Sequence, residues 1–316
     1  MPDSARPPAP AIRCRGLVKR YGDVVAVNAL DLEVKRGECF GLLGPNGAGK
    51  TTTIEILEGL MAHDAGDVEV LGLRWGESDR RLRQRLGIQL QETQLHDKLT
   101  VVETLRLFRS FYDRGRPLEE VLSVVELEAK RDSRVGSLSG GQKQRLAVGC
   151  ALVGEPDVLF LDEPTTGLDP QSRRQLWSLL ERFRARGGTI LLTTHYMDEA
   201  EILCDRIAIV DHGRVIALGT PPELIASLGA AHVVAFALEE GSQGPGADEL
   251  RALPGVRNVS VEDGQIQLIA AEVHVTVPAL LRALAERDAR LSLLTTHGAT
   301  LEDVFVRLTG RHLRDA

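Results

Sequence analysis

The sequence predicts an α/β protein built on a parallel β-sheet that helices cover on both faces. Three strongly apolar segments, at 39–43, 157–161 and 189–193, are separated by segments with helical spacing. Strands without a polar face are typical of a parallel sheet that is buried on both sides. A glycine-rich turn follows the first apolar segment and two carboxylates follow the second. The ends of the buried strands are therefore the places to look for chemistry.

Composition limits the classes of protein that fit this chain. Its 316 residues are 43% hydrophobic and 26% charged, which is ordinary for a soluble globular protein with one large and one smaller domain. A net charge of −7 argues against broad nucleic-acid binding, and no nucleic-acid partner is expected. No apolar run approaches the roughly 18 residues of a membrane span. The four widely spaced cysteines predict structural thiols in a reducing cytoplasm.

The first half of the chain predicts β structure followed by a helical insertion. Residues 1–11 are proline-rich, lack the apolar core of a signal peptide, and are expected to form a disordered tail. Residues 12–43 alternate as an antiparallel β layer would, before the strand that enters the glycine-rich turn. Segment 92–150 is nearly all helical in spacing and predicts an inserted helical subdomain. Thr100 and Glu103 form a capping box at one helix start within it.

The second half returns to alternating helices and strands, and then changes composition. We expect a first domain at 12–228 and a separate small α/β domain at 229–316, for which ferredoxin-like order is the candidate topology. No chemical motif is visible in the second domain. The predicted strands of the second half are 206–210, 215–218, 232–238 and 265–270, and the predicted helices are 173–186, 198–203, 277–287 and 301–308.

The glycine-rich turn fits the phosphate-binding pattern G-x-x-x-x-G-K-[ST]. Its glycines allow successive N–H groups to point at one anion, and the following helix adds its positive end. Lys50 is expected to reach the β- and γ-phosphates and the Thr51 hydroxyl to bind Mg²⁺. The residues predicted to surround the phosphates are Gly44, Pro45, Asn46, Gly47, Ala48, Gly49, Lys50, Thr51 and Thr52.

Asp162 and Glu163 follow the apolar segment that ends at Leu161. A carboxylate at the end of a buried strand beside a phosphate loop holds Mg²⁺, directly or through water, which we expect of Asp162. The next carboxylate, Glu163, is placed to polarise a water that attacks the γ-phosphorus.

A second anion site is predicted at a helix start between these two features. Ser139 caps the helix, Gly140 and Gly141 expose N–H groups at its positive end, and Gln142 completes the segment. The segment lies between the phosphate loop and the Asp-Glu pair in chain order.

Together these residues resemble the nucleotide-binding domain of the ABC transporter family over residues 12–228. The loop, the signature Leu138–Gln142 and the Asp-Glu pair occur in family order, followed by Gly167 to Pro170 and by Thr194 and His195. The resemblance implies a P-loop NTPase fold with a RecA-like parallel sheet, and a protein that binds and hydrolyses ATP with Mg²⁺.

The resemblance also implies roles for four further residues. Tyr21 is similar to the aromatic residue that stacks on adenine, and Asp169 to the family's dimer-contact aspartate. His195 corresponds to the histidine that senses the γ-phosphate. Gln91 is our choice for the lid glutamine that contacts Mg²⁺ and the attacking water; Gln89 and Gln94 stay open as alternatives.

By the same resemblance, the working unit is a head-to-tail homodimer. Each ATP is sandwiched between the loop of one copy and the signature of the other, and dimer opening drives a separate transmembrane permease subunit. The chain is then expected to be cytoplasmic and peripheral on the inner face of the cell membrane.

Within the family, several segments resemble the daunorubicin-resistance type that serves drug, lipid and polysaccharide exporters. These are 44–53, 165–170, 194–201, and 300–305 followed by 308–310. The alternatives are a soluble ABC-type ATPase that acts on ribosomes or DNA, an importer ATPase, and a regulatory module that no longer hydrolyses ATP. The sequence does not name the cargo, because a membrane subunit chooses it.

Overall fold

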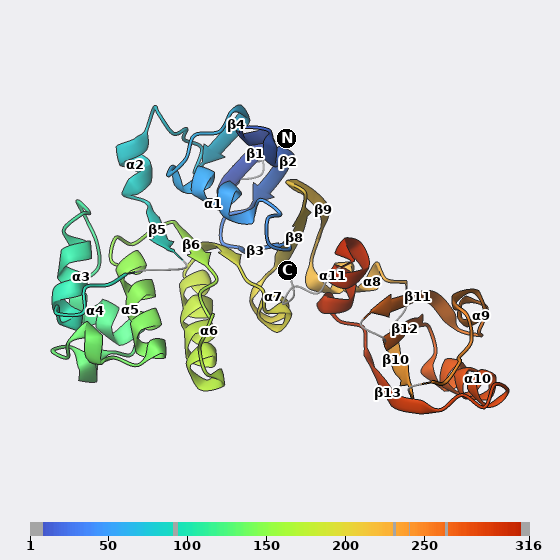
Figure 1. Ribbon diagram of the computed structural model, residues 1–316. Helices are drawn as coiled ribbons and strands as arrows, with labels where there is room; N and C mark the ends of the chain where they lie inside the picture. Colours follow the sequence, from blue (N-terminus) through green and yellow to red (C-terminus); the bar gives the residue numbers. More distant parts are fainter. Residues whose placement is uncertain (1–8, 91–93, 230–231, 240, 263–264, 311–316) are drawn as a thin grey trace, which may run out of the picture. The chain divides into compact units, whose positions relative to one another are not determined.

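The computed structural model describes residues 9–90, 94–229, 232–239, 241–262 and 265–310 (Figure 1). The chain divides into two compact units, the first ending at Leu218 and the second beginning at Gly219. The division falls earlier than the predicted boundary at 229. Helix α8 (Pro221–Ala226) explains the difference, because it packs against α11 (Leu301–Thr309) of the second unit.

A mainly parallel sheet forms the centre of the first unit, as the sequence predicts. Among the described residues its strand order is β5–β6–β7–β3–β8–β9. Every residue of β3, β6 and β7 is buried. These three strands are neighbours and run parallel, so their carboxyl ends meet at one edge of the sheet. The strands are β3 (Cys39–Leu43), β5 (Leu86–Gln89), β6 (Val158–Asp162), β7 (Thr189–Thr193), β8 (Arg206–Asp211) and β9 (Arg214–Gly219).

An antiparallel sheet of β2 (Val24–Val34), β1 (Ile12–Tyr21) and β4 (Ala65–Val70) lies in the same unit. Helix α1 (Lys50–Glu58) leaves the glycine-rich turn and contacts both β2 and β6. Its apolar residues Ile54, Ile56 and Leu57 join one core with strands of both sheets. The helix that follows the phosphate loop is therefore fixed between the two sheets.

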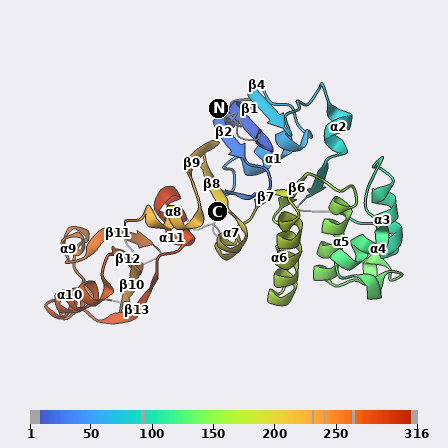
Figure 2. The same ribbon diagram turned by 180° about the vertical axis from the view of Figure 1, so that it is seen from behind.

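A group of helices occupies the predicted insertion. Helix α2 (Asp79–Arg83) precedes it, and the group contains α3 (Val101–Arg109), α4 (Leu118–Val124) and α5 (Gly140–Leu152). Figures 1 and 2 both show α3, α4 and α5 gathered together, and the three contact one another. The long helix α6 (Pro170–Ala185) packs against α5, and α7 (Met197–Leu203) follows β7.

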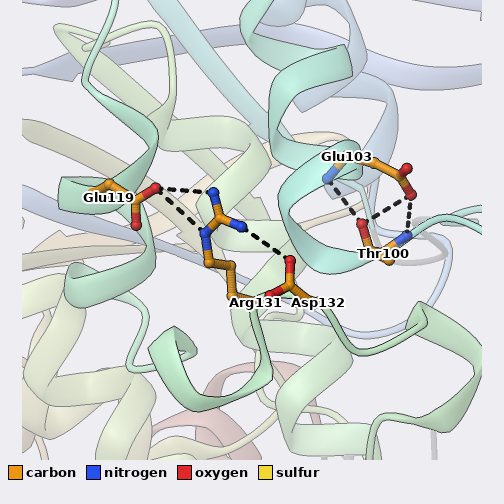
Figure 3. A network of polar contacts seen from close by, with 5 residues as sticks. All are labelled: Thr100, Glu103, Glu119, Arg131 and Asp132. Carbon is orange, nitrogen blue, oxygen red and sulfur yellow. Dashed lines mark hydrogen bonds and ion pairs between the residues drawn. The ribbon is translucent and has the colours of Figure 1, made fainter.

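Polar contacts fix the ends of these helices (Figure 3). Thr100 caps α3: the Glu103 N–H donates to Thr100 Oγ1 over 3.3 Å, and the Thr100 N–H donates to Glu103 Oε2 over 2.8 Å. The predicted capping box is thereby confirmed. Nearby, the Arg131 guanidinium donates to Glu119 Oε1 and to Asp132 Oδ1, and so ties the start of α4 to the turn that follows it.

After α8, the second unit has the element order β–α–β–β–α–β, followed by α11. Its strand order, β11–β12–β10–β13 with antiparallel neighbours, is the ferredoxin-like arrangement. Strands β10 (His232–Leu238) and β12 (Gln265–Ala270) have the bounds that the sequence predicts. Helix α10 (Val273–Ala285) starts before the predicted 277. The elements of this unit that were not predicted from sequence are α8, α9 (Ala247–Arg251), β11 (Val256–Glu262) and β13 (Leu291–Gly298).

Candidate active site

The glycine-rich loop joins β3 to α1. At position 49 its backbone has a conformation that only glycine can adopt. Gly49 has φ +97°, and a Cβ there would lie 2.2 Å from the Ala26 carbonyl oxygen of β2. At Gly44 a Cβ would lie 2.3 Å from the carbonyl oxygen of Val210. The backbone of the loop therefore presses directly against two strands, which orients its N–H groups.

Lys50 begins α1 and folds back over the loop. Its Nζ donates to the carbonyl oxygens of Gly44 over 2.7 Å and Pro45 over 3.1 Å. Burial lowers the pKa of the Lys50 ammonium, and the carboxylates of Glu163 and Asp162 oppose this by raising it. The Lys50 side chain thus bonds to the loop and interacts electrostatically with the carboxylates at the end of β6.

A cavity of about 370 Å³ lies between the loop and the end of β6. Carboxylate, ammonium, hydroxyl and backbone groups line it, as a phosphate site requires. The lining residues are Val24, Val25, Ala26, Asn46, Gly47, Gly49, Lys50, Thr51, Thr52, Asp162 and Glu163.

Asp162 ends β6 and accepts a short hydrogen bond from Thr193 Oγ1 at the end of β7. Burial raises the pKa of the Asp162 carboxyl, and the charge of Glu163 raises it further. The bond from Thr193 and the charge of Lys50 lower it. A cation beside this carboxyl would favour its ionised form.

Glu163 follows Asp162 at φ +48°, in the left-handed region. Its N–H donates to Thr193, both to the carbonyl oxygen over 3.2 Å and to Oγ1 over 3.1 Å. These bonds hold the turn that carries the side chain into the cavity. The Glu163 carboxylate lies 3.2 Å from His195 Nδ1 and accepts from Thr166 Oγ1 over 3.3 Å. Glu163 and His195 therefore form a contact pair, although 32 positions separate them in sequence (195 − 163 = 32).

The predicted second anion site is a capped helix start. The Gln142 N–H donates to Ser139 Oγ over 3.3 Å, and the Ser139 N–H donates to Gln142 Oε1 over 3.1 Å. Ser139 and Gly140 are exposed. Among the described residues, none of positions 139–142 lines the cavity beside Lys50. One chain thus does not bring its two anion sites together.

Asp169 caps α6 and stands next to this helix start. Its Oδ1 accepts from the N–H groups of Gln171 and Ser172, each over 3.0 Å, and its Oδ2 accepts from Ser172 Oγ over 2.6 Å. The Ser172 bonds hold the pKa of Asp169 below its usual value. A Cβ on Gly141 would lie 2.3 Å from Ser172 Oγ. The start of α5 therefore packs against the first turn of α6, which Asp169 caps.

Among the described residues, Tyr21, Gln89 and Gln94 do not line the cavity beside Lys50. Tyr21 is 47% exposed at the end of β1, and its hydroxyl contacts Met61 Sδ at 2.8 Å. Gln91, the predicted lid glutamine, lies outside the described residues. Gln89 is buried at the end of β5, where its Nε2 donates to the Leu90 carbonyl over 2.6 Å, and Gln94 is exposed.

Two supporting residues were not predicted. Thr193 bonds both Asp162 and the Glu163 backbone, and the sequence signal was a hydroxyl at the end of an apolar strand. Glu199 is fully buried, and accepts from Thr165 Oγ1 over 3.1 Å and from Trp177 Nε1 over 2.9 Å. It ties the loop after Glu163 to α6 and α7, and no sequence pattern marked it.

Comparison with known proteins gives a consistent result. Residues 27–166 match the family described as ABC transporter. A protein named Nod factor export ATP-binding protein I, from Burkholderia lata, is 43% identical over 314 residues, which cover 98% of this chain and 100% of that protein. The protein of the same name from Ralstonia nicotianae is 42% identical and covers 97% of this chain and 96% of its own length.

The solved structures that this chain resembles belong to the same class of protein as these relatives. A structure described as an ATP binding subunit of an ABC transporter has a TM-score of 0.64 and 32% identity, and covers 69% of this chain and 93% of that one. A dimeric bacterial ABC transporter cassette has a TM-score of 0.60 and 28% identity, covering 66% of this chain and 98% of that one. These relatives are named as export ATP-binding proteins, and the match covers 100% and 96% of their lengths, which favours export over the importer and ribosome- or DNA-acting alternatives.

Proposed function

The chain belongs to the ABC transporter family, and from this premise we propose how its residues couple ATP hydrolysis to export. It is an ATP-binding subunit of the export type and an ATPase. The observation that carries the proposed roles is the meeting of Lys50, Asp162 and Glu163 around one cavity, with His195 in contact with Glu163.

We propose that the loop residues 44–52 hold the ATP phosphates. Lys50 exchanges its present carbonyl partners, Gly44 and Pro45, for β- and γ-phosphate oxygens, which the N–H groups at the start of α1 also face. The exchange replaces neutral acceptors by charged ones and so strengthens the lysine's hydrogen bonds.

The Mg²⁺ site is proposed at Thr51 and Asp162, both of which line the cavity. A hydroxyl and a carboxylate are the hard oxygen donors that suit Mg²⁺. The described residues contain no cluster of three or more His, Cys, Asp and Glu that could hold a metal ion, so phosphate and water oxygens would complete the shell. When bound, Mg²⁺ supplies charge neutralisation at the phosphates. The proposed third ligand is Gln91.

Glu163 is proposed to polarise the attacking water, with His195 holding its carboxylate and contacting the γ-phosphate. The contact of 3.2 Å between His195 Nδ1 and Glu163 Oε2 supports this pairing. The three bonds that fix the Glu163 backbone and side chain, from its own N–H and from Thr166, support a preset orientation.

A homodimer is proposed to complete each site. The exposed helix start at Ser139 supports this, because it lies outside the cavity of its own chain. In a two-fold pair, each signature faces the partner's loop, and two equivalent sites result. Asp169 would lie at the same contact surface, and Tyr21 would stack on adenine.

We propose that the dimer works on a separate transmembrane permease subunit at the inner face of the cell membrane, as the export names of the relatives suggest. Among the described helices, none combines the length and hydropathy of a membrane-spanning segment. Nod factor, named for the relatives, is the first candidate cargo. Inverted membrane vesicles with the complete transporter should accumulate it when ATP is added; absence of ATP-dependent uptake would exclude this cargo.

Ser139→Arg tests the shared site. The variant should bind ATP like the wild type but hydrolyse it at least about a hundredfold more slowly, because a large cation replaces the cap that faces the partner's phosphates. Mixing it one-to-one with Lys50→Ala should restore up to about a quarter of wild-type turnover, since half of the dimers then contain one intact site. Ser137→Arg, two positions earlier, is the control. Absence of recovery in the mixture would argue for a site within one chain.

Tyr21→Ala tests adenine stacking. Loss of the ring should weaken ATP binding by about 1–3 kcal/mol, the range for base–aromatic stacking, without abolishing it. Tyr21→Phe keeps the ring but loses the hydroxyl contact to Met61, and should bind nearly as well as the wild type. Calorimetric titration with ATP distinguishes the two variants, and equal affinities for all three proteins would remove Tyr21 from the site.

A further inference from the structure

A fully buried carboxylate contacts two of the loops that build the candidate site. Glu199, in helix α7, has no exposed surface. Its Oε2 accepts from Thr165 Oγ1 over 3.1 Å, and its Oε1 accepts from Trp177 Nε1 over 2.9 Å. The hydroxyl of Thr194 is a third donor to the same carboxylate. Three donors from separate segments of the chain thus meet at one side chain.

These donors stabilise the ionised form of Glu199. Burial raises the pKa of its carboxyl, and the hydrogen bonds from its three donors partly offset this rise. The positive charge of Arg173 also lowers the pKa. An ionised carboxylate only accepts, so it can bond to all three donors at once. Loss of the carboxylate would leave buried donors unpaired, which is costly.

The bond from Thr194 orients the turn that carries His195. Thr194 is buried, and its Oγ1 accepts from the Tyr196 N–H over 3.0 Å. A hydroxyl has one proton and two lone pairs. While the proton points at Glu199, the lone pairs hold the Tyr196 N–H and close the turn across His195. Without the carboxylate, the hydroxyl proton needs another acceptor, and the turn loses its fixed geometry.

The bond from Thr165 acts on the loop that carries Glu163. Thr165 is buried two residues after Glu163. Its neighbour Thr166 donates twice to Glu163, from its N–H to the carbonyl oxygen over 3.2 Å and from Oγ1 to Oε2 over 3.3 Å. Anchoring Thr165 therefore fixes the direction from which Thr166 reaches the carboxylate.

Arg173 adds a counter-charge from helix α6 and packs on the same turn as His195. Its guanidinium carbon lies 4.1 Å from the centre of the Tyr196 ring, and its Nη1 lies 3.6 Å from Asp198 Oδ2. Its Nε is buried, and no described residue gives it a hydrogen-bond partner. The charge of Glu199 therefore compensates a cation that is itself partly buried.

We propose that Glu199 is a positioning residue, which sets the contact between Glu163 and His195 by anchoring the two loops that carry them. Among the described residues, Glu199 does not line the cavity of the candidate site, so it acts through the hydroxyls of Thr165 and Thr194. The proposal rests on the proposed function, because it takes Glu163 and His195 as the residues that act on water and the γ-phosphate. A shift of about 1 Å in such groups can slow a reaction about a hundredfold.

Steady-state kinetics of the full-length chain test this role. Glu199→Gln keeps the size of the side chain but offers one acceptor oxygen instead of two. The Trp177 N–H cannot reverse, so it takes that oxygen, and the threonine hydroxyls must turn to accept from the amide. We expect kcat to fall at least about tenfold while KM for ATP changes less than about threefold. Glu181→Gln, at an exposed position of α6, is the control and should keep wild-type kinetics.

A double-mutant cycle tests whether Glu199 acts through the threonines. Thr194→Val removes one hydroxyl with little change of shape, and should itself lower kcat at least about tenfold. Combined with Glu199→Gln, the loss should stay close to that of the more impaired single variant, because both changes break one bond. Losses that multiply would overturn the proposal, as would a wild-type kcat for Glu199→Gln. If Glu199→Gln does not fold, Thr194→Val decides: a wild-type kcat overturns the proposal, and the tenfold loss at unchanged KM supports it.

Trp177→Phe separates positioning from general stability. It removes the third donor without changing either loop, so it should lower the melting temperature but leave kcat within about threefold of wild type. A loss of kcat as large as that of Glu199→Gln would mean that any weakening of this buried network suffices, which contradicts a positioning role. The proposed function fails separately: wild-type turnover by Glu163→Gln would overturn it. Loss of turnover by Glu163→Gln together with a wild-type kcat for Glu199→Gln would overturn only the role of Glu199.

Discussion

Glu163→Gln is expected to bind ATP, to accumulate as a closed dimer, and to hydrolyse ATP at least about a hundredfold more slowly than the wild type. The substitution keeps the size of the side chain and removes only its ability to accept a proton from water. It also removes the Glu163 charge, which raises the pKa of Asp162, and so lessens repulsion of the ATP phosphates in the same cavity. Binding should therefore be retained or strengthened while turnover is lost.

Steady-state phosphate release and size-exclusion chromatography with ATP measure the two effects together. Glu155→Gln is a suitable control, because Glu155 is exposed and contacts only Arg116 at 3.9 Å among the ion pairs of the described residues. It should turn over ATP at the wild-type rate and show the same elution. Normal hydrolysis by Glu163→Gln would remove Glu163 from the role of water-polarising base. A variant that hydrolyses slowly but never dimerises would contradict the shared site instead.

The sequence could predict those parts of the fold in which the local pattern of apolar residues matches the burial of the element. Strands β3, β6 and β7 are buried throughout and mostly apolar because both faces are covered, so the sequence shows them plainly. Edge strand β13 could not be predicted: most of its residues are exposed, and it forms by pairing with β10, more than fifty residues earlier. The boundary at 219 depends in the same way on a distant contact, that of α8 with α11.

The residues of the candidate site also fall into two groups, those that the sequence could place and those that it could not. The phosphate loop and the signature are continuous segments with their own spacing, so sequence places their residues in the correct elements. The bonds of Thr193 to Asp162 and of Glu199 to Trp177 join separate elements, and only the assembled sheet and helices bring them together.

Gly49→Ala is expected to destabilise the first unit by about 3 kcal/mol or more, because backbone strain and a steric collision add. The residue has φ +97°, and the new Cβ would lie 2.2 Å from the carbonyl oxygen of Ala26, an atom fixed in strand β2. Relief requires the loop or β2 to move. The loop carries Lys50 and the N–H groups at the start of α1, so ATP binding should be lost along with stability.

Gly47→Ala separates strain from collision in the same loop. Gly47 has φ +78°, but a Cβ there would meet nothing within 4 Å, so the substitution should cost only about 1 kcal/mol of left-handed backbone strain. Chemical denaturation of the wild type and both variants measures the difference in the free energy of unfolding. Equal losses at the two positions would mean that positive φ alone explains the glycines of this loop. A much larger loss at Gly49 would mean that contact with β2 fixes the loop in its phosphate-binding shape.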